Sequence, residues 1–261
     1  MRKFGLIGYP LTHSFSQRYF SEKFEREGIA DCVYSNFSIG SIGELGAVLA
    51  DAELCGLNVT IPYKQQVMPF LDALSPVAEA IGACNCISIE GGRRIGDNTD
   101  VVGFEQSLVK QLSGHHRKAL VLGTGGAAKA VEWVLRRLGI DYLSVSRRAG
   151  GDGSGGDGAG AGRPGHGAGS IGYADVDAAL LATHTLIVNT TPVGMYPDIS
   201  VCPPLPYEAL TRQHYLFDLV YNPARTLFLQ KGEAHGAVVE NGYDMLVLQA
   251  EESWRIWNSP L

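Results

Sequence analysis

Short apolar runs alternate with longer amphipathic stretches along the 261 residues, which is the pattern of an α/β protein. Apolar runs of a few residues predict strands, and apolar residues spaced three to four positions apart predict helices. The first hundred residues predict strands at 3–8, 33–37 and 56–59, helices at 14–27, at 42–51 and from Tyr63 behind Pro62, and a hairpin of 86–90 with 94–96 around Gly91-Gly92.

A helix over 101–112 follows, and the alternation resumes after a polar break at 113–117. The second part predicts strands at 118–122, 142–146, 185–188, 214–219 and 238–240, and helices at 126–138, 176–182, 224–234 and 243–257. We therefore expect one α/β domain up to about residue 101 and a second over 102–238. The pattern leaves open which domain the last helix joins.

One segment of the second predicted domain is unusually rich in glycine. The chain has 33 glycines, and twelve of them lie between Gly150 and Gly172. A tract of Gly, Ala, Asp and Ser buries too little apolar surface to offset the entropy lost on ordering. We predict a flexible loop over 149–172, inserted into the second domain.

Charge and cysteine content exclude several classes of protein. The net charge of −6 argues against a nucleic-acid binder, and no apolar run is long enough for a membrane helix. The N-terminus lacks the apolar core of a signal peptide. The five cysteines are odd in number and form no Cys-x-x-Cys pair, so we expect neither disulfides nor a metal site. These features predict a cytoplasmic protein.

The segment 120–130, LVLGTGGAAKA, runs from an apolar strand through glycines into a helix, the context of a dinucleotide-binding turn. Gly123 permits the tight turn, and Gly125 and Gly126 let the backbone approach a pyrophosphate at the helix N-terminus. The next predicted strand ends in Arg147-Arg148 without a carboxylate, which favours the 2′-phosphate of NADP over NAD. A glycine turn without a ligand and two solvated arginines are the simpler alternatives.

In the first domain, small polar residues follow the predicted strands. Ser14 and Ser16, Thr60, Lys64 and Asp100 each have a local explanation, as helix caps or as a solvated charge. Together they indicate a ligand site, because ligands bind at the carboxyl edge of open α/β sheets.

These segments resemble the shikimate dehydrogenase family, which reduces 3-dehydroshikimate with NADPH. The family stretches H-S-x-S, N-V-T-x-P-x-K, G-A-x-N, D-N-T-D, G-x-G-G, N-x-T-x-x-G-M and M-L-x-x-Q have counterparts at 13–16, 58–64, 82–85, 97–100, 123–126, 189–195 and 245–249. The resemblance follows nearly the whole chain in order. It implies an N-terminal α/β substrate domain with a mainly parallel sheet, a Rossmann-type dinucleotide domain and a cleft between them.

The resemblance also implies a role for each matching residue. Lys64 and Asp100 would form the catalytic acid–base pair. The substrate would be held by Ser14, Ser16, Asn58, Thr60, Asn85, Tyr221 and Gln249. NADP(H) would be held by Gly123, Gly125, Gly126, Ala127, Arg147, Arg148, Asn189, Thr190, Met195 and Gly242. The match of Gln249 implies that residues 239–261 return to the first domain.

The chain departs from the family at two places. Gln17-Arg18-Tyr19-Phe20 replaces the usual continuation after Ser16, and the glycine tract follows Arg148. The second departure predicts a looser 2′-phosphate site with NADP preference retained. Two alternatives are a quinate/shikimate dehydrogenase that uses NAD and a non-catalytic nucleotide-sensing homologue. A third, a generic short-chain reductase, would need a Tyr-x-x-x-Lys pair, which we do not expect here. The expected partner is a small-molecule substrate, bound by a monomer or a homodimer.

Overall fold

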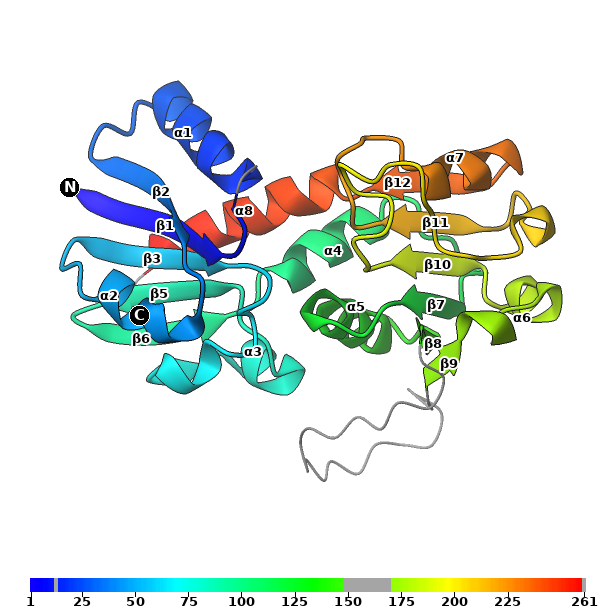
Figure 1. The fold of residues 1–261 in the computed structure, drawn as a ribbon, viewed down its shortest axis with the longest axis horizontal. Helices are drawn as coiled ribbons and strands as arrows, with labels where there is room; N and C mark the ends of the chain where they lie inside the picture. The colour runs from blue at the N-terminus through cyan, green and yellow to red at the C-terminus, as the bar shows by residue number, and fades with distance from the viewer. Residues whose placement is uncertain (12–13, 148–169, 260–261) are drawn as a thin grey trace. The chain divides into compact units, whose positions relative to one another are not determined.

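The computed structural model describes residues 1–11, 14–147 and 170–259 (Figure 1). The chain forms two compact units, Met1–Asp100 with Leu248–Leu261, and Val101–Val247. The chain passes between the units inside two helices, α4 (Asp100–Leu108) and α8 (Tyr243–Trp257). Arg148 and most of the tract that we expect to be flexible lie outside the described residues.

The first unit contains a six-stranded mixed sheet in the order β2-β1-β3-β5-β6-β4. Its strands are β1 (Arg2–Gly8), β2 (Cys32–Ser38), β3 (Leu54–Val59), β4 (Ala73–Leu74), β5 (Cys86–Glu90) and β6 (Arg93–Asp97). β1 is parallel to β2 and β3, whereas β5 is antiparallel to β3 and β6. The predicted hairpin of β5 and β6 is confirmed, with Gly91 and Gly92 at φ values of +58° and +81°.

Helices and short 3₁₀ turns connect these strands. They are α1 (Phe15–Glu27), a 3₁₀ turn at Ile42–Glu44 that continues into α2 (Leu45–Leu49), a 3₁₀ turn at Met68–Phe70, and α3 (Pro76–Ile81). Phe4, Phe20 and Trp257 pack together in the core on one side, where Trp257 also covers Gly56. A Cβ at Gly56 would lie 2.4 Å from the indole Nε1, so the fit of α8 on this sheet requires glycine there.

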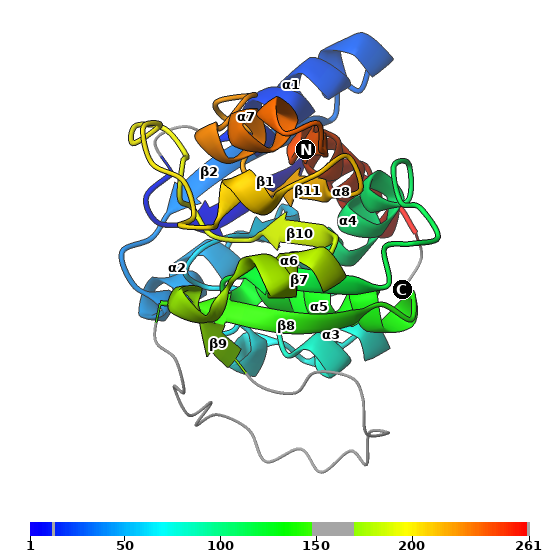
Figure 2. The same cartoon turned by 90° about the vertical axis from the view of Figure 1, so that its right-hand side faces the viewer.

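The second unit contains a six-stranded parallel sheet in the order β12-β11-β10-β7-β8-β9. Figure 2 shows β11, β10, β7, β8 and β9 in this order. Its strands are β7 (Lys118–Leu122), β8 (Asp141–Ser146), β9 (Ser170–Gly172), β10 (Leu186–Asn189), β11 (Tyr215–Asp218) and β12 (Val238–Asn241). Counted from β7, this is the 3-2-1-4-5-6 order of the doubly wound dinucleotide fold. The order reverses between β7 and β10, so the ligand crevice of this fold lies at their carboxyl ends.

The connecting elements of the second unit are α5 (Gly126–Arg137), a 3₁₀ turn at Tyr173–Asp175, α6 (Ala178–Thr183), a 3₁₀ turn at Tyr207–Ala209, and α7 (Leu227–Ala234). The central strands of the sheet are largely apolar, and Leu120, Ile187 and Leu216 are fully buried. No helix in the described part of the chain has both the length and the apolar character needed to cross a membrane.

The structure corrects four sequence predictions. No helix opens at Tyr63, because Pro69 lacks an N–H and would clash with the carbonyl four residues earlier. Instead, turns lead to the 3₁₀ turn at Met68–Phe70. The helix predicted to 112 ends at Leu108. The predicted flexible loop ends too late, since Ser170–Gly172 pairs with β8. The first domain does not resume at 239, because β12 pairs with β11 and the change of unit falls at Leu248.

Candidate active site

The polar segments of the first unit meet at one edge of its sheet. β1 and β3 end there, at Gly8 and Val59. Asn85 directly precedes β5. Since β5 is antiparallel to β3, its amino end reaches the same edge, where Cys86 pairs with Asn58 and with Asp97. The sheet therefore brings together the segments that carry Asn58, Asn85 and Asp97–Asp100.

Lys64 and Asp100 form an ion pair at this edge. Lys64 Nζ lies 2.5 Å from Asp100 Oδ2, and the side chains are 16% and 8% exposed. The turn that carries Lys64 is fixed on both sides, because the Lys64 carbonyl accepts from Cys84 N at 2.7 Å and the buried Tyr63 donates to the Ile39 carbonyl. The pairing predicted from the family resemblance is therefore present within one unit.

Asp100 is held by more than the lysine. Asn85 Nδ2 donates to Asp100 Oδ1 at 2.8 Å and to Thr99 Oγ1 at 3.0 Å, while Thr99 N donates to Asn85 Oδ1 at 2.6 Å. Asp100 is also the first residue of α4, where unpaired N–H groups stabilise a carboxylate. The carboxylate can thus hold the Lys64 ammonium in one orientation while both groups remain largely shielded from water.

Asn58 belongs to the same buried network. Its Oδ1 accepts from the Tyr34 hydroxyl at 2.8 Å, and its Nδ2 donates to Ser253 Oγ at 2.8 Å. Ser253 is fully buried on α8 and lies 3.2 Å from Thr99 Oγ1. Sequence reasoning missed Tyr34, Thr99 and Ser253. A signal for Ser253 was available, since it stands four residues after Gln249 on the apolar stripe of the last helix.

The other predicted substrate residues of this unit lie on the same elements. Ser14 caps α1, where its Oγ accepts from Gln17 N at 3.4 Å, so the local explanation is correct for this residue. Ser16 is buried, and it forms a hydrogen bond with Tyr34 that lowers the pKa of that phenol, which burial raises well above its usual value. Gln249 is buried on α8 beside Thr99. Thr60 opens the turn to Lys64 and caps no helix.

The chain also contains a Tyr-x-x-x-Lys spacing that sequence reasoning overlooked, at Tyr19 and Lys23 on α1. Both side chains bind Glu251 on α8, and Lys23 also bridges to Glu27 at 2.9 Å. The Lys23 side chain is 6% exposed. These contacts join α1 to α8, the helices that carry Ser16 and Gln249.

In the second unit, the predicted glycine turn connects β7 to α5. Gly123 has a φ of +109°, and a Cβ there would lie 2.7 Å from Thr190 Oγ1 and 2.9 Å from Thr191 Cγ2. Gly125 is the exposed N-cap of α5, and a Cβ on it would meet no atom within 4 Å. Gly126 and the half-buried Ala127 form the first turn of α5. The free space before a twelve-residue helix suits an anionic group.

β8 ends beside the residue predicted to select the nucleotide. Arg147 follows Ser146 directly and is exposed, and its charge lowers the pKa of Tyr173, which burial raises. Ser170 on β9 donates to Ser146 Oγ at 3.1 Å. No carboxylate ends β8, in keeping with the prediction for a 2′-phosphate.

The last residue of β10 and the segment after it include three predicted cofactor residues, which differ in burial. Met195 is 45% exposed, and Thr190 is half-buried, donating to the Leu122 carbonyl at 2.7 Å. Asn189 is fully buried, and both ends of its amide bind the protein. Its side chain therefore fixes the start of the loop, and its predicted contact with the cofactor stays a prediction.

Tyr221 and Gly242 complete the predicted set. Tyr221 is half-buried and follows β11, in the second unit, so its predicted contact with the substrate stays a prediction. Gly242 lies against the chain after β11, where a Cβ would be 2.1 Å from the Leu219 carbonyl oxygen. This close approach gives Gly242 a packing reason, independent of any cofactor.

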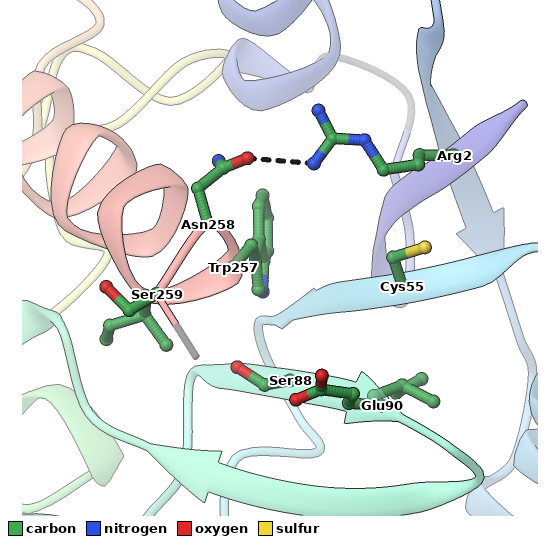
Figure 3. A pocket seen from close by; sticks show the side chains of 9 residues that line it. Arg2, Cys55, Ser88, Glu90, Trp257, Asn258 and Ser259 are labelled. Atoms are coloured by element: carbon green, nitrogen blue, oxygen red, sulfur yellow. Dashed lines mark hydrogen bonds between the residues drawn. The ribbon is translucent and has the colours of Figure 1, made fainter. Parts of the chain in front are cut away.

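A pocket of about 380 Å³ lies at the other edge of the first sheet (Figure 3). It is lined by Arg2, Cys55, Ser88, Ile89, Glu90, Ile256, Trp257, Asn258 and Ser259. Arg2 donates to Asn258 Oδ1 at 2.8 Å, and Trp257 Nε1 donates to the Ile87 carbonyl. This pocket contains none of the predicted site residues.

Comparisons with known proteins identify the same family on both units. Residues 6–87 match the family model of the shikimate dehydrogenase substrate binding domain. An NADP(+) shikimate dehydrogenase of Oleidesulfovibrio alaskensis is 40% identical over 258 residues, covering 97% of this chain and 88% of the relative. One from Desulforamulus reducens is 33% identical with the same coverage.

Solved structures of the same family are also similar to this chain. A shikimate 5-dehydrogenase of Thermus thermophilus, solved in complex with NADP(H) and shikimate, matches with a TM-score of 0.81 and 30% identity. The match covers 100% of this chain and 95% of that one. The similarity therefore extends over both units and includes the segments that carry the ion pair and the glycine turn.

Proposed function

The chain belongs to the shikimate dehydrogenase family, and from that premise we propose that it catalyses the reversible NADPH-dependent reduction of 3-dehydroshikimate to shikimate. The observation that carries the proposal is the Lys64–Asp100 ion pair, shielded from water at the ligand edge of the first sheet. A ketone that accepts a hydride becomes an alkoxide, which needs a positioned proton donor.

The Lys64 ammonium is that donor in our proposal. Its Nζ stabilises the developing negative charge on the substrate oxygen and gives that oxygen a proton. In the reverse direction the neutral amine takes the proton from the alcohol. Asp100 holds the ammonium through Oδ2 and binds a substrate hydroxyl, while Asn85 fixes Oδ1.

The remaining polar side chains of the first unit bind the substrate. Ser14 and Ser16 on α1 provide neutral hydroxyl donors for the carboxylate, with Tyr221 assisting, and the ring hydroxyls are held by Asn58, Thr60, Asn85 and Gln249. Both ends of the Asn58 and Asn85 amides are already bonded within the protein, and the two Oδ1 atoms accept from the Tyr34 hydroxyl and from Thr99 N. Asn58 Oδ1 has a second lone pair, which a substrate hydroxyl would use.

The second unit fits a dinucleotide. The space that Gly125 leaves open before α5 suits the pyrophosphate, and Arg147 suits a 2′-phosphate. Bound NADP(H) supplies or accepts the hydride. Thr190 and Met195 lie in the segment after β10, which begins beside the glycine turn. The Asn189 amide fixes the start of this segment by accepting a hydrogen bond from Thr191.

The proposal is tested by the absorbance of the reduced nicotinamide, using the purified protein with shikimate or quinate and NADP⁺ or NAD⁺ in parallel. We expect the fastest absorbance rise with shikimate and NADP⁺. A faster rate with quinate and NAD⁺ would favour the quinate/shikimate dehydrogenase. Cofactor binding without any turnover would favour the non-catalytic homologue.

Replacing Arg147 tests the choice of nucleotide. We expect Arg147→Ala to raise KM for NADP⁺ by about 10- to 100-fold, because hydrogen bonds to a charged group contribute roughly 1.5–3 kcal/mol. KM for NAD⁺ should change little, since NAD⁺ has no 2′-phosphate. The measurement is KM for both nucleotides at saturating shikimate.

Arg117→Ala is the matched control, because Arg117 is an exposed arginine just before β7, at the opposite edge of the sheet. It should leave both values unchanged. Equal effects of Arg147→Ala on NADP⁺ and NAD⁺ would remove Arg147 from the 2′-phosphate site.

A further inference from the structure

Asp218 is a fully buried carboxylate at the carboxyl end of β11. It accepts three hydrogen bonds, all from neutral groups: Asn189 Nδ2 at 2.9 Å, Val220 N at 3.0 Å and Thr226 Oγ1 at 2.6 Å. These donors come from the last residue of β10, the turn after β11 and the N-cap of α7. One side chain therefore joins three segments at the ligand edge of the second sheet.

The contact with Asn189 continues to the glycine turn. Asn189 Oδ1 accepts from Thr191 N at 3.1 Å and from Thr191 Oγ1 at 2.6 Å. Thr191 Cγ2 is one of the atoms that would crowd a Cβ on Gly123. The hydrogen bonds thus run from Asp218 through Asn189 to the threonine packed beside the turn where the pyrophosphate is expected.

We propose that Asp218 is a positioning residue for the cofactor: its ionised carboxylate holds the segment after β10 against the glycine turn. This inference rests on the proposed function, which places NADP(H) at that turn. An acceptor-only group suits the position, because all three partners are donors. The burial of a carboxylate without a cationic partner would otherwise only cost stability.

The proton affinity of Asp218 gives the proposal a distinctive readout. Burial raises the pKa of Asp218 to about 6, although the hydrogen bonds from Thr226, Val220 and Asn189 oppose that rise. β12 places the neutral Asn241 beside it in register. Burial raises the pKa of the Tyr207 phenol, and the charge of Asp218 adds to that rise. Below about pH 6 the carboxyl group therefore carries a proton and resembles an asparagine amide.

The sign of the effect on stability follows. Between the ordinary value of 3.8 and about 6, the folded chain holds a proton that the unfolded chain has released, so Asp218 lowers the free energy of unfolding as pH rises through this window. Asp218→Asn removes this pH dependence of the free energy of unfolding. A purely structural carboxylate would show its effect in Tm, whereas a positioning residue shows it in cofactor affinity.

The experiment titrates NADPH fluorescence with the full-length chain and without substrate, so it does not depend on turnover. We expect Asp218→Asn to bind NADPH about threefold to tenfold more weakly than the wild type at about pH 7.5, since charge-assisted hydrogen bonds are roughly twice as strong as neutral ones. At about pH 5 the two proteins should bind equally. Their ratio cancels the titration of the cofactor phosphate itself.

Thr226→Val offers a second test, because it removes the donor to Oδ2 and leaves the carboxylate in place. It should also weaken NADPH binding at about pH 7.5, and Thr226→Ser should restore it. Asp177→Asn is the control, since Asp177 only caps α6.

Equal NADPH affinity of Asp218→Asn and wild type at about pH 7.5 would overturn the proposal, as would a difference that persists at about pH 5. If instead the wild type binds NADPH as expected but does not turn over shikimate, the proposed function fails and the inference about Asp218 stands.

Discussion

Lys64→Ala should lower kcat by about 10²- to 10⁴-fold, the range of a lost general acid–base group. KM for shikimate should stay within a few-fold, because the hydroxyl and amide groups around the substrate remain. The reason is geometric: Lys64 Nζ is held 2.5 Å from Asp100 at the ligand edge, where we propose that the reacting oxygen binds. Steady-state kinetics with shikimate and NADP⁺ measure both constants.

One further variant separates the charge of Lys64 from its ability to give up a proton, and a second serves as its control. Lys64→Arg keeps the positive charge but cannot give up its proton at neutral pH, so it should stay nearly as slow as the alanine variant. Lys3→Ala is the matched control, since Lys3 is an ion-paired lysine of the same unit that bridges to Asp51 and Glu53. A kcat within tenfold of wild type for Lys64→Ala would exclude Lys64 as the proton donor.

The sequence predicts best those elements whose hydrophobic residues follow a single periodicity. The strand 118–122 and the helix 243–257 are confirmed with the same bounds, since one is a continuous apolar run and the other has a long helical stripe. The helix α3 was missed although its signals are present: Ser75 caps it, Pro76 opens it and Gly82 ends it at a φ of +68°. Its six residues are too few for a visible period.

The residues of the candidate site likewise divide into those that the sequence predicts and those that it does not. The ion pair of Lys64 and Asp100 was predicted through motifs that follow the order of the chain. The partners that orient the amides were not, because Tyr34 and Ser253 lie 24 and 195 residues from Asn58 and reach it only through the packing of β2 and α8. Asn189 shows what a motif does not indicate: the residue is fully buried and its amide binds Thr191, while its contact with a cofactor stays a prediction.

The hydrophobic pattern of β11 gives no indication of the contacts that Asp218 makes. It ends the buried strand Tyr215–Asp218, and a carboxylate at that point has the sequence appearance of an ordinary strand end. Only the three donors that converge on it, from segments up to 29 residues away, show that it joins loops. Such contacts depend on the order of strands in the sheet, which the one-dimensional pattern does not contain.

Asp100→Asn should be nearly as damaging as the loss of the lysine, with kcat lowered by about 10²-fold or more. The replacement keeps the shape of the side chain but presents an NH₂ group to one of two donors, Lys64 Nζ or Asn85 Nδ2. The ammonium then loses its anionic partner in a site where it is 16% exposed. An unpaired, largely buried charge is costly, so the lysine should leave its orientation.

The double variant Lys64→Ala/Asp100→Asn makes the test decisive. Groups that act as one unit are strongly non-additive, so the double variant should be about as slow as Lys64→Ala alone. Asp72→Asn, which alters an exposed carboxylate paired with Arg94 in the same unit, should leave kcat unchanged. If the double variant showed the product of the two single effects, the two residues would act independently, and the ion pair would not be the catalytic unit.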